Sequence, residues 1–214
     1  MESRHMVDHD TLIDTLCDEA VPVRRVAPAW RRALAWSPVA LGIGYLATQM
    51  LHRAGTDWAG PLAGVAAANI VLSLALGIAA FTAALSASVP GAPARTSGWI
   101  MACLGIWLTL AAYSIGISSQ PVGHLGHGSY CFTFVLVAGV PMIAITVLAL
   151  RRTRSLNPVR SLMLAGTGIA FLSFGLLAFC HPIAMSAMDF AGHLVAGVLL
   201  GALTIGLGRK AIAA

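Results

Sequence analysis

The chain has 214 residues, of which 58% are hydrophobic and only 10% are charged. Soluble domains carry about 25% charged residues, so this composition argues against a soluble globular protein. The formal net charge of +5 does not indicate nucleic-acid binding, because no basic run is interleaved with aromatic side chains that would stack on bases.

The first 32 residues form the one polar segment large enough to act outside a membrane. Within it, "DHDTLIDTLCDEA", residues 8–20, predicts a short helix that ends near Pro22. The apolar face of this helix consists of Leu12, Ile13, Leu16 and Ala20. The next stretch, "PVRRVAPAWRR", predicts a basic, extended linker that contains Arg24 and Arg25.

A helix this short is marginal alone in water, so its apolar face needs a partner. One interpretation places it on the membrane surface or against the 151–158 loop. The other is recognition of a soluble protein, with the helix lying in a groove of the partner. The acidic flank weakens the membrane-surface interpretation, because helices that bind anionic leaflets are usually basic.

Six apolar blocks follow the polar segment. Each is roughly 19 to 25 residues long, enough to cross the hydrocarbon core as a helix, and lipid offers the backbone amides no other partner. The blocks cover residues 33–51, 62–86, 98–117, 132–150, 159–179 and 189–207. We therefore expect an all-α polytopic membrane protein with six transmembrane helices and a short cytoplasmic N-terminal helix. The expected parts are an N-terminal segment over 1–32, a six-helix domain over 33–208 and a tail over 209–214.

The basic residues indicate the orientation. Of thirteen lysines and arginines, all except Arg53 lie on or next to the side that holds both termini. The positive-inside rule makes this side cytoplasmic, and anionic lipid would reinforce it. We expect a bacterial inner-membrane protein whose opposite end faces an oxidising compartment.

Two cysteines lie at that outer end. Cys131 opens the fourth apolar block and Cys180 closes the fifth. They would form a disulfide if their Cα atoms came within about 7 Å of each other. Of the other two cysteines, Cys17 is expected to stay reduced in the cytoplasm, and Cys103 is expected to be a small packing residue.

Further metal-ligating side chains share the outer face, and they are His124, His127, His181, Asp189 and His193. With Cys131 and Cys180 they offer thiolate, imidazole and carboxylate groups that suit zinc, copper or cadmium. Asp189 and His193 are four residues apart and so share one helical face. The spacing matches no fixed zinc module. The loop histidines are equally consistent with solvated residues, and His193 with an interhelical hydrogen bond.

The rest of the sequence narrows the function. No ionisable residue lies in the middle of a block, so no proton relay is visible, and no nucleotide loop or catalytic motif occurs. We therefore expect a protein that is not an enzyme. Asn69 and Ser73 are expected to make interhelical hydrogen bonds. The Gly197-x3-Gly201 step permits close helix packing or a homodimer.

The stretch "LIDTLCDEAVPVRRVAPAWRRAL", leading into six spans with outer cysteines at 131 and 180, resembles the bacterial negative regulator of sigma-F (NrsF) family. The resemblance covers essentially the whole chain, and its most specific parts are the "PVRR…P.WRR" linker and the two cysteines. Members are six-helix inner-membrane anti-sigma factors. The resemblance implies that residues 10–32 bind an extracytoplasmic-function sigma factor. It also implies that Cys131 and Cys180 sense a periplasmic heavy metal or oxidant that releases this partner.

On this hypothesis the partner-binding residues are Leu12, Ile13, Leu16, Ala20, Arg24 and Arg25. No permanent cofactor is expected, and a transiently bound zinc, copper or cadmium ion would be the signal. The partners are the sigma factor and membrane lipids, and the chain would not contact nucleic acid directly. Two alternatives stay open: a membrane metal-ion carrier, and a thiol redox membrane protein.

Overall fold

The computed structural model describes residues 9–20, 26–51, 55–89, 98–118, 128–153 and 155–212. Their elements, in chain order, are α1 (His9–Asp18), α2 (Ala29–Ala47), the 3₁₀ helix η1 (Thr48–Met50), α3 (Ala63–Ala87), α4 (Gly98–Gly116), α5 (Gly128–Arg151), α6 (Pro158–Leu177) and α7 (Ala187–Ile212). No β-strand occurs within these ranges. The predicted all-α fold is therefore confirmed.

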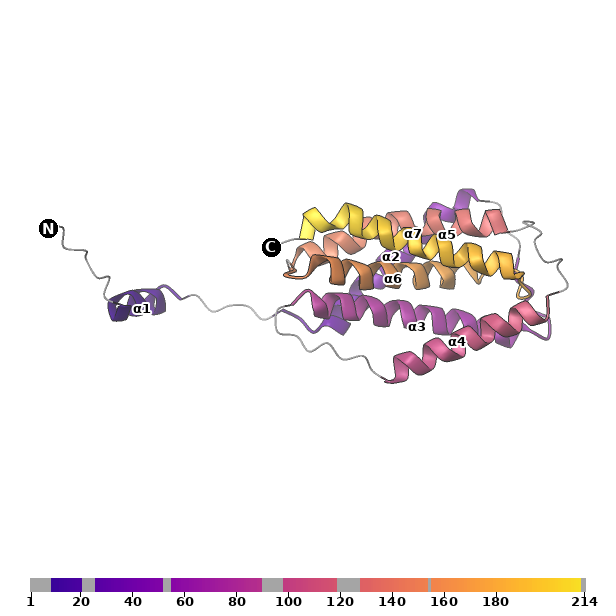
Figure 1. Cartoon of the computed structure of the whole chain (residues 1–214), viewed down its shortest axis with the longest axis horizontal. Coiled ribbons are helices and arrows are strands. Elements are labelled where there is room, and N and C mark those ends of the chain that lie inside the picture. The colour runs from indigo at the N-terminus through magenta and orange to yellow at the C-terminus, as the bar shows by residue number, and fades with distance from the viewer. Residues whose placement is uncertain are drawn as a thin grey trace.

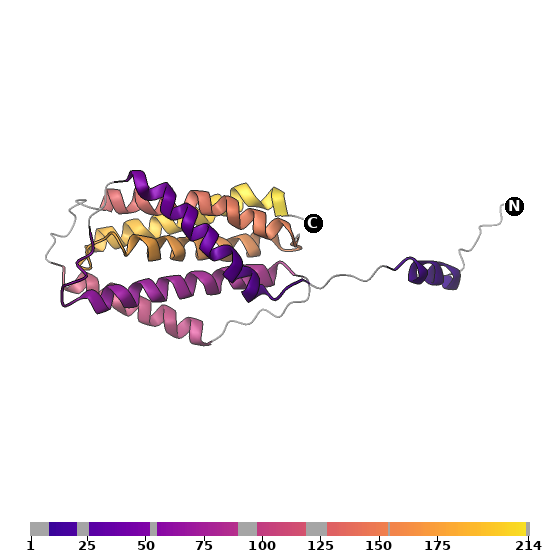
Figure 2. The same cartoon turned by 180° about the vertical axis from the view of Figure 1, so that it is seen from behind.

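Helices α2 to α7 form one elongated bundle (Figure 1). Helix α6 is central and packs against α3, α5 and α7, while α7 also packs against α5. Helix α4 lies at the edge against α3. Helix α2 crosses the bundle obliquely over α5 and α3, as Figure 2 shows.

Glycines let the central helices approach closely. A Cβ added to Gly168 of α6 would lie 3.0 Å from the carbonyl oxygen of Gly77 of α3. A Cβ added to Gly197 of α7 would lie 3.3 Å from Cβ of Ala170 of α6. At least one glycine of the Gly197-x3-Gly201 step therefore serves packing within one chain. The structure does not bear on the predicted homodimer.

Five of the helices, α3 to α7, are long and apolar enough to cross a membrane. The chain is thus a multi-pass membrane protein, and five of the six predicted spans coincide with these helices. Helix α2 occupies the first predicted block but is less apolar than the others. Its first turn contains Arg31 and Arg32, and Pro38 and Tyr45 follow within the helix.

The bundle has two chemically different ends. The basic end contains the start of α2 and the ends of α5 and α7, with Arg32, Arg152 and Lys210. A cluster of fully buried apolar side chains closes it, formed by Ala33, Leu85, Leu150, Leu162 and Ile212. The cysteine end is the opposite one and contains the start of α5, the end of α6 and the start of α7.

Helix α1 is not part of the bundle. Every described residue of α1 is exposed, and α1 is not among the helices that pack extensively against one another. The helix ends at Asp18, so Ala20 lies beyond it and not on its apolar face as predicted. There the chain turns, with the Ala20 amide donating to the carbonyl oxygen of Cys17 at 3.2 Å.

Candidate metal centre

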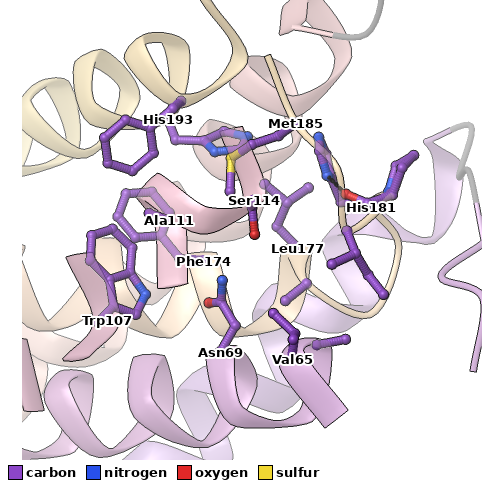
Figure 3. A pocket seen from close by; sticks show the side chains of 15 residues that line it. Val65, Asn69, Trp107, Ala111, Ser114, Phe174, Leu177, His181, Met185 and His193 are labelled. Carbon is purple, nitrogen blue, oxygen red and sulfur yellow. Dashed lines mark hydrogen bonds between the residues drawn. The ribbon is translucent and has the colours of Figure 1, made fainter. Parts of the chain in front are cut away.

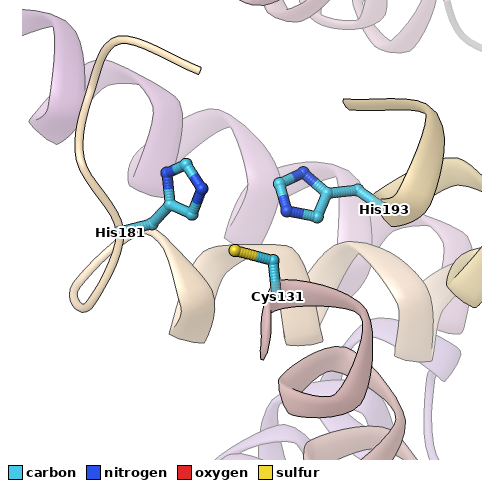
Figure 4. A group of neighbouring side chains, drawn as sticks. All are labelled: Cys131, His181 and His193. Carbon is cyan, nitrogen blue, oxygen red and sulfur yellow. The ribbon is translucent and has the colours of Figure 1, made fainter. Parts of the chain in front are cut away.

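Three potential metal ligands meet at the cysteine end of the bundle. Cys131 comes from the first turn of α5, His181 from the connection between α6 and α7, and His193 from the second turn of α7. One ligand atom of each side chain lies within 4.8 Å of the ligand atoms of the other two. Figure 4 shows a ring nitrogen of each histidine directed toward Sγ of Cys131. The two imidazole rings are nearly perpendicular, with centroids 5.5 Å apart.

Two reciprocal hydrogen bonds cap the start of α7 and so fix the turn that precedes His193. The amide of Asp189 donates to Oγ of Ser186 at 3.0 Å, and the amide of Ser186 donates to Oδ2 of Asp189 at 3.2 Å. This capping box satisfies amides that the first turn of a helix leaves unpaired. His193 follows Asp189 by four residues, so both side chains point to the same side of α7.

The position of His181 depends on an element distant in sequence. Thr56, between α2 and α3, donates its hydroxyl to the carbonyl oxygens of Ala178 and His181, both at 3.0 Å. Farther along the connection, the amide of Met185 reaches the carbonyl oxygen of Ser114 of α4 at 3.4 Å. These contacts hold the α6–α7 connection against the bundle.

A further hydrogen bond determines the protonation of the His181 ring. Nδ1 of His181 lies within hydrogen-bond distance of the carbonyl oxygen of Pro182. A carbonyl oxygen can only accept, so Nδ1 carries the proton and donates it. In the neutral ring Nε2 then keeps its lone pair, which is the state that a metal ligand requires.

The cluster is buried and contains unsatisfied polar atoms. Cys131, His181, His193 and Asp189 are between 5% and 9% exposed. Within the described residues, Nε2 of His193 and Oδ1 of Asp189 have no hydrogen-bond partner. Leaving such atoms unpaired costs roughly 1–3 kcal/mol each. Asp189 is close enough to interact electrostatically with both Cys131 and His193.

An aromatic pocket adjoins the cluster and shares its two histidines (Figure 3). Trp107 of α4 lies along the pocket, stacked on Phe174 with ring centroids 6.0 Å apart. Its indole N–H donates to Oγ of Ser73 at 2.9 Å, and Ser73 in turn donates to Oδ1 of Asn69 at 3.1 Å. The predicted interhelical hydrogen bond is thus confirmed for Ser73, whereas the hydrogen bond to Asn69 lies within α3.

The structure brings only one of the two predicted sensor cysteines, Cys131, into the ligand cluster. Cys180 is not among the clustered ligands and instead lines a different cavity beside Tyr45, Phe134 and Phe179. All four cysteines lie in the described ranges and none forms a disulfide. Cys103 is partly buried against the core, and Cys17 is exposed.

The remaining predicted residues fall into two groups. His124, His127, Arg24 and Arg25 lie outside the described residues. Leu12, Ile13 and Leu16 lie on α1 and are 46%, 55% and 59% exposed. The sequence reasoning missed Ser186 and Thr56, which position the histidines. The Ser-x-x-Asp spacing before an apolar block was the available signal for Ser186, whereas no local pattern marked Thr56.

Comparison of the chain with known protein families, curated proteins and solved structures gives no match. The resemblance to the NrsF family therefore stays a prediction.

Proposed function

We propose that this protein is a membrane anti-sigma factor. Its cytoplasmic N-terminal segment would hold an extracytoplasmic-function sigma factor, and a heavy-metal or redox signal at the cysteine end would release it. The observation that carries the proposal is the exposed apolar face of α1. Leu12, Ile13 and Leu16 form that face and none of them is buried within the chain. An amphipathic helix with an uncovered apolar face is the element that lies in a groove of a partner.

The chemistry of α1 favours a protein partner over the lipid surface. Asp10, Asp14 and Asp18 lie on the same short helix, which carries no basic residue apart from His9. Helices that lie on anionic membranes usually carry lysine and arginine on their polar face. A groove with an apolar floor and basic rims would complement α1 on both faces.

The proposal includes six spans, with α2 as the first. Helix α2 and η1 together cover residues 29–50, long enough to cross the hydrocarbon core. Arg31 and Arg32 stand at the very start of α2, where their side chains would reach the headgroups. Arg152 lies over the ring of Trp36 at 5.4 Å from its centroid, as expected of an interfacial aromatic residue.

The same topology would put α1 and the cysteine end of the bundle on opposite sides of the inner membrane. The basic end would be cytoplasmic by the positive-inside rule, with α1 beyond it and both termini on that side. The cysteine end would face the periplasm. A signal there acts on the sigma factor only if the two states of the bundle hold it with different free energies.

The cluster of Cys131, His181 and His193 also favours a second candidate, a metal-ion carrier that uses this cluster as its outer mouth. A carrier would move zinc or cadmium into vesicles that contain the purified protein. An anti-sigma factor would not, so this flux assay separates the two functions. The redox alternative would require exchange of a disulfide between Cys131 and Cys180, and no disulfide joins them in the structure.

The proposal is tested by co-purification of the full-length chain with the extracytoplasmic-function sigma factors of the same genome. We expect one of them to bind the wild type and to be lost from Leu16→Gln. Glutamine keeps the helix propensity of leucine but removes the apolar contact. Thr15→Gln on the polar face of α1 is the matched control and should retain the partner. Binding of no sigma factor, or equal binding by Leu16→Gln, would refute the proposal.

A further inference from the structure

We propose that Cys131, His181 and His193 form a binding site for a single divalent cation of the zinc group, Zn²⁺ or Cd²⁺, and that Cys180 is not a ligand. The role of this site as the sensor rests on the proposed function. Binding of the ion does not, because it depends only on the geometry of the cysteine end.

The three ligand atoms are close to coordination distance. Each lies within 4.8 Å of the others. Zinc bonds of about 2.0–2.3 Å to nitrogen and sulfur place neighbouring ligand atoms roughly 3.5 Å apart. Closing the cluster onto an ion therefore needs a contraction of about an ångström. His181 lies in a connection between helices and not within one, so small rotations there can supply the movement.

Each imidazole has a ring nitrogen that is suited to bind a metal ion. The hydrogen bond from Nδ1 of His181 to the carbonyl oxygen of Pro182 orients the ring and leaves the lone pair on Nε2. Histidines that bind metals almost always donate their other ring nitrogen in this way. Nε2 of His193 is buried without a hydrogen-bond partner in the described part of the chain, and His193 is only 8% exposed. An ion would satisfy this atom.

The charges at the cluster fit a divalent ion. Binding converts the Cys131 thiol to a thiolate and releases its proton to water, so the ion and Sγ together carry one positive charge. Asp189, 6% exposed and electrostatically coupled to Cys131 and His193, supplies the second negative charge. A buried charge needs such compensation. The described arginines and lysine lie at the basic end, too far from the cluster to repel a cation there.

The ligand set indicates which metal ions the site favours. One thiolate with two imidazoles suits zinc and its heavier congener cadmium, while calcium and magnesium prefer oxygen ligands. Three protein ligands leave one tetrahedral position open, as in zinc sites that keep a water or an exchangeable group. The aromatic pocket shares His181 and His193 with the cluster (Figure 3) and offers space beside these ligands. The site is therefore suited to an ion that binds and leaves.

The test uses the full-length chain, purified in detergent under reducing conditions and titrated with Cd²⁺ and then Zn²⁺. The cadmium–thiolate charge-transfer absorbance reports the thiolate, and elemental analysis after dialysis reports the stoichiometry. We expect one ion per chain. Cys131→Ser and His193→Gln should each weaken binding at least tenfold, and Cys131→Ser should abolish the absorbance band. Cys180→Ser and Cys103→Ser are matched controls and should bind as the wild type does.

Each result decides the proposal. Wild-type protein that binds no ion, Cys131→Ser and His193→Gln variants that bind normally, or a Cys180→Ser variant that fails to bind would each overturn it. Circular dichroism and size-exclusion profiles identify variants that fail to fold, and His181→Gln then replaces such a variant. Metal binding without an effect on the sigma factor in cells would overturn only the proposed function. A chain that binds the sigma factor but takes up no ion in the titration would overturn only the site.

Discussion

Gly166 of α6 lies against Gly201 of α7 so closely that a Cβ on Gly166 would sit 2.7 Å from Cα of Gly201. Real Cβ atoms do not approach backbone atoms to this distance, so the two helices depend on a missing side chain. Where lipid removes the hydrophobic drive between helices, such close backbone contact is a main source of association.

We expect Gly166→Ala to force α6 and α7 apart and to destabilise the bundle by about 1–3 kcal/mol. Gly206→Ala on α7 is the control, since a Cβ there would meet no atom within 4 Å. It should be neutral or slightly stabilising, because alanine is the better helix former. Unfolding in mixed detergent micelles measures both variants, and equal stability of the two would contradict the interpretation.

The hydrogen bond from Trp107 to Ser73 joins α4 to α3. Trp107→Phe removes the donor and keeps an aromatic ring beside Phe174. Hydrogen bonds between membrane helices contribute roughly 0.6 kcal/mol on average and at most about 1.7 kcal/mol. We therefore expect Trp107→Phe to lower the free energy of unfolding by about 1 kcal/mol. In a double-mutant cycle with Ser73→Ala, the double variant should lose less unfolding free energy than the sum of the two single variants. Strictly additive losses would mean that the hydrogen bond contributes nothing.

Asp189 both caps α7 and balances charge near the ligands. Asparagine at this position keeps an acceptor for the Ser186 amide but removes the negative charge. We therefore expect Asp189→Asn to unfold like the wild type yet to bind Zn²⁺ about tenfold more weakly, the size of effect typical of residues surrounding metal ligands. Ser186→Ala is the converse control. It should lose about 1 kcal/mol of stability while keeping the carboxylate.

Thr56 fastens the α6–α7 connection through its hydroxyl. Thr56→Val has nearly the same shape but leaves the carbonyl oxygens of Ala178 and His181 without this donor. We expect Thr56→Val to lower the free energy of unfolding by about 1–3 kcal/mol. We also expect faster amide exchange in residues 178–186. Hydrogen-exchange mass spectrometry measures the second effect. Unchanged exchange in that segment would show that other contacts hold the connection.

Sidedness can be measured with a membrane-impermeant maleimide. Cys131 is only 5% exposed and is a poor target, so an exposed residue must replace it as the reporter. In a chain without Cys103, Cys131 and Cys180, we expect Ala59→Cys near the cysteine end to be labelled on intact spheroplasts. Cys17 on α1 should be labelled only after lysis. Labelling of Cys17 on intact cells would reverse the proposed orientation.

Apolar block length predicted the helices well because a long lipid-facing segment has one stable conformation. The block at 62–86 becomes Ala63–Ala87, and the block at 159–179 becomes Pro158–Leu177. The block at 33–51 overlaps α2 and η1, but α2 begins with Arg31 and Arg32 and is less apolar than the other helices, so its span stays a prediction.

The site was predictable only in part. Placement along the helices put Cys131, His181 and His193 at one end, and the four-residue spacing put Asp189 and His193 on one face. Which ligands meet depends on the packing of α5 against α7, and apolar periodicity does not encode that packing. Cys180 and His181 are adjacent in sequence, yet the turn after α6 directs them into different cavities. A turn of this kind is set by tertiary contacts such as those of Thr56.

Helix α7 runs without interruption from Ala187 to Ile212. At a rise of 1.5 Å per residue, His193 and Ile212 are roughly 28 Å apart along one stiff rod. Ile212 is fully buried in the same apolar cluster as Ala33, at the root of the helix that follows the N-terminal segment. Any axial movement of α7 would therefore be felt at both of its ends, at His193 and in the buried cluster that contains Ala33.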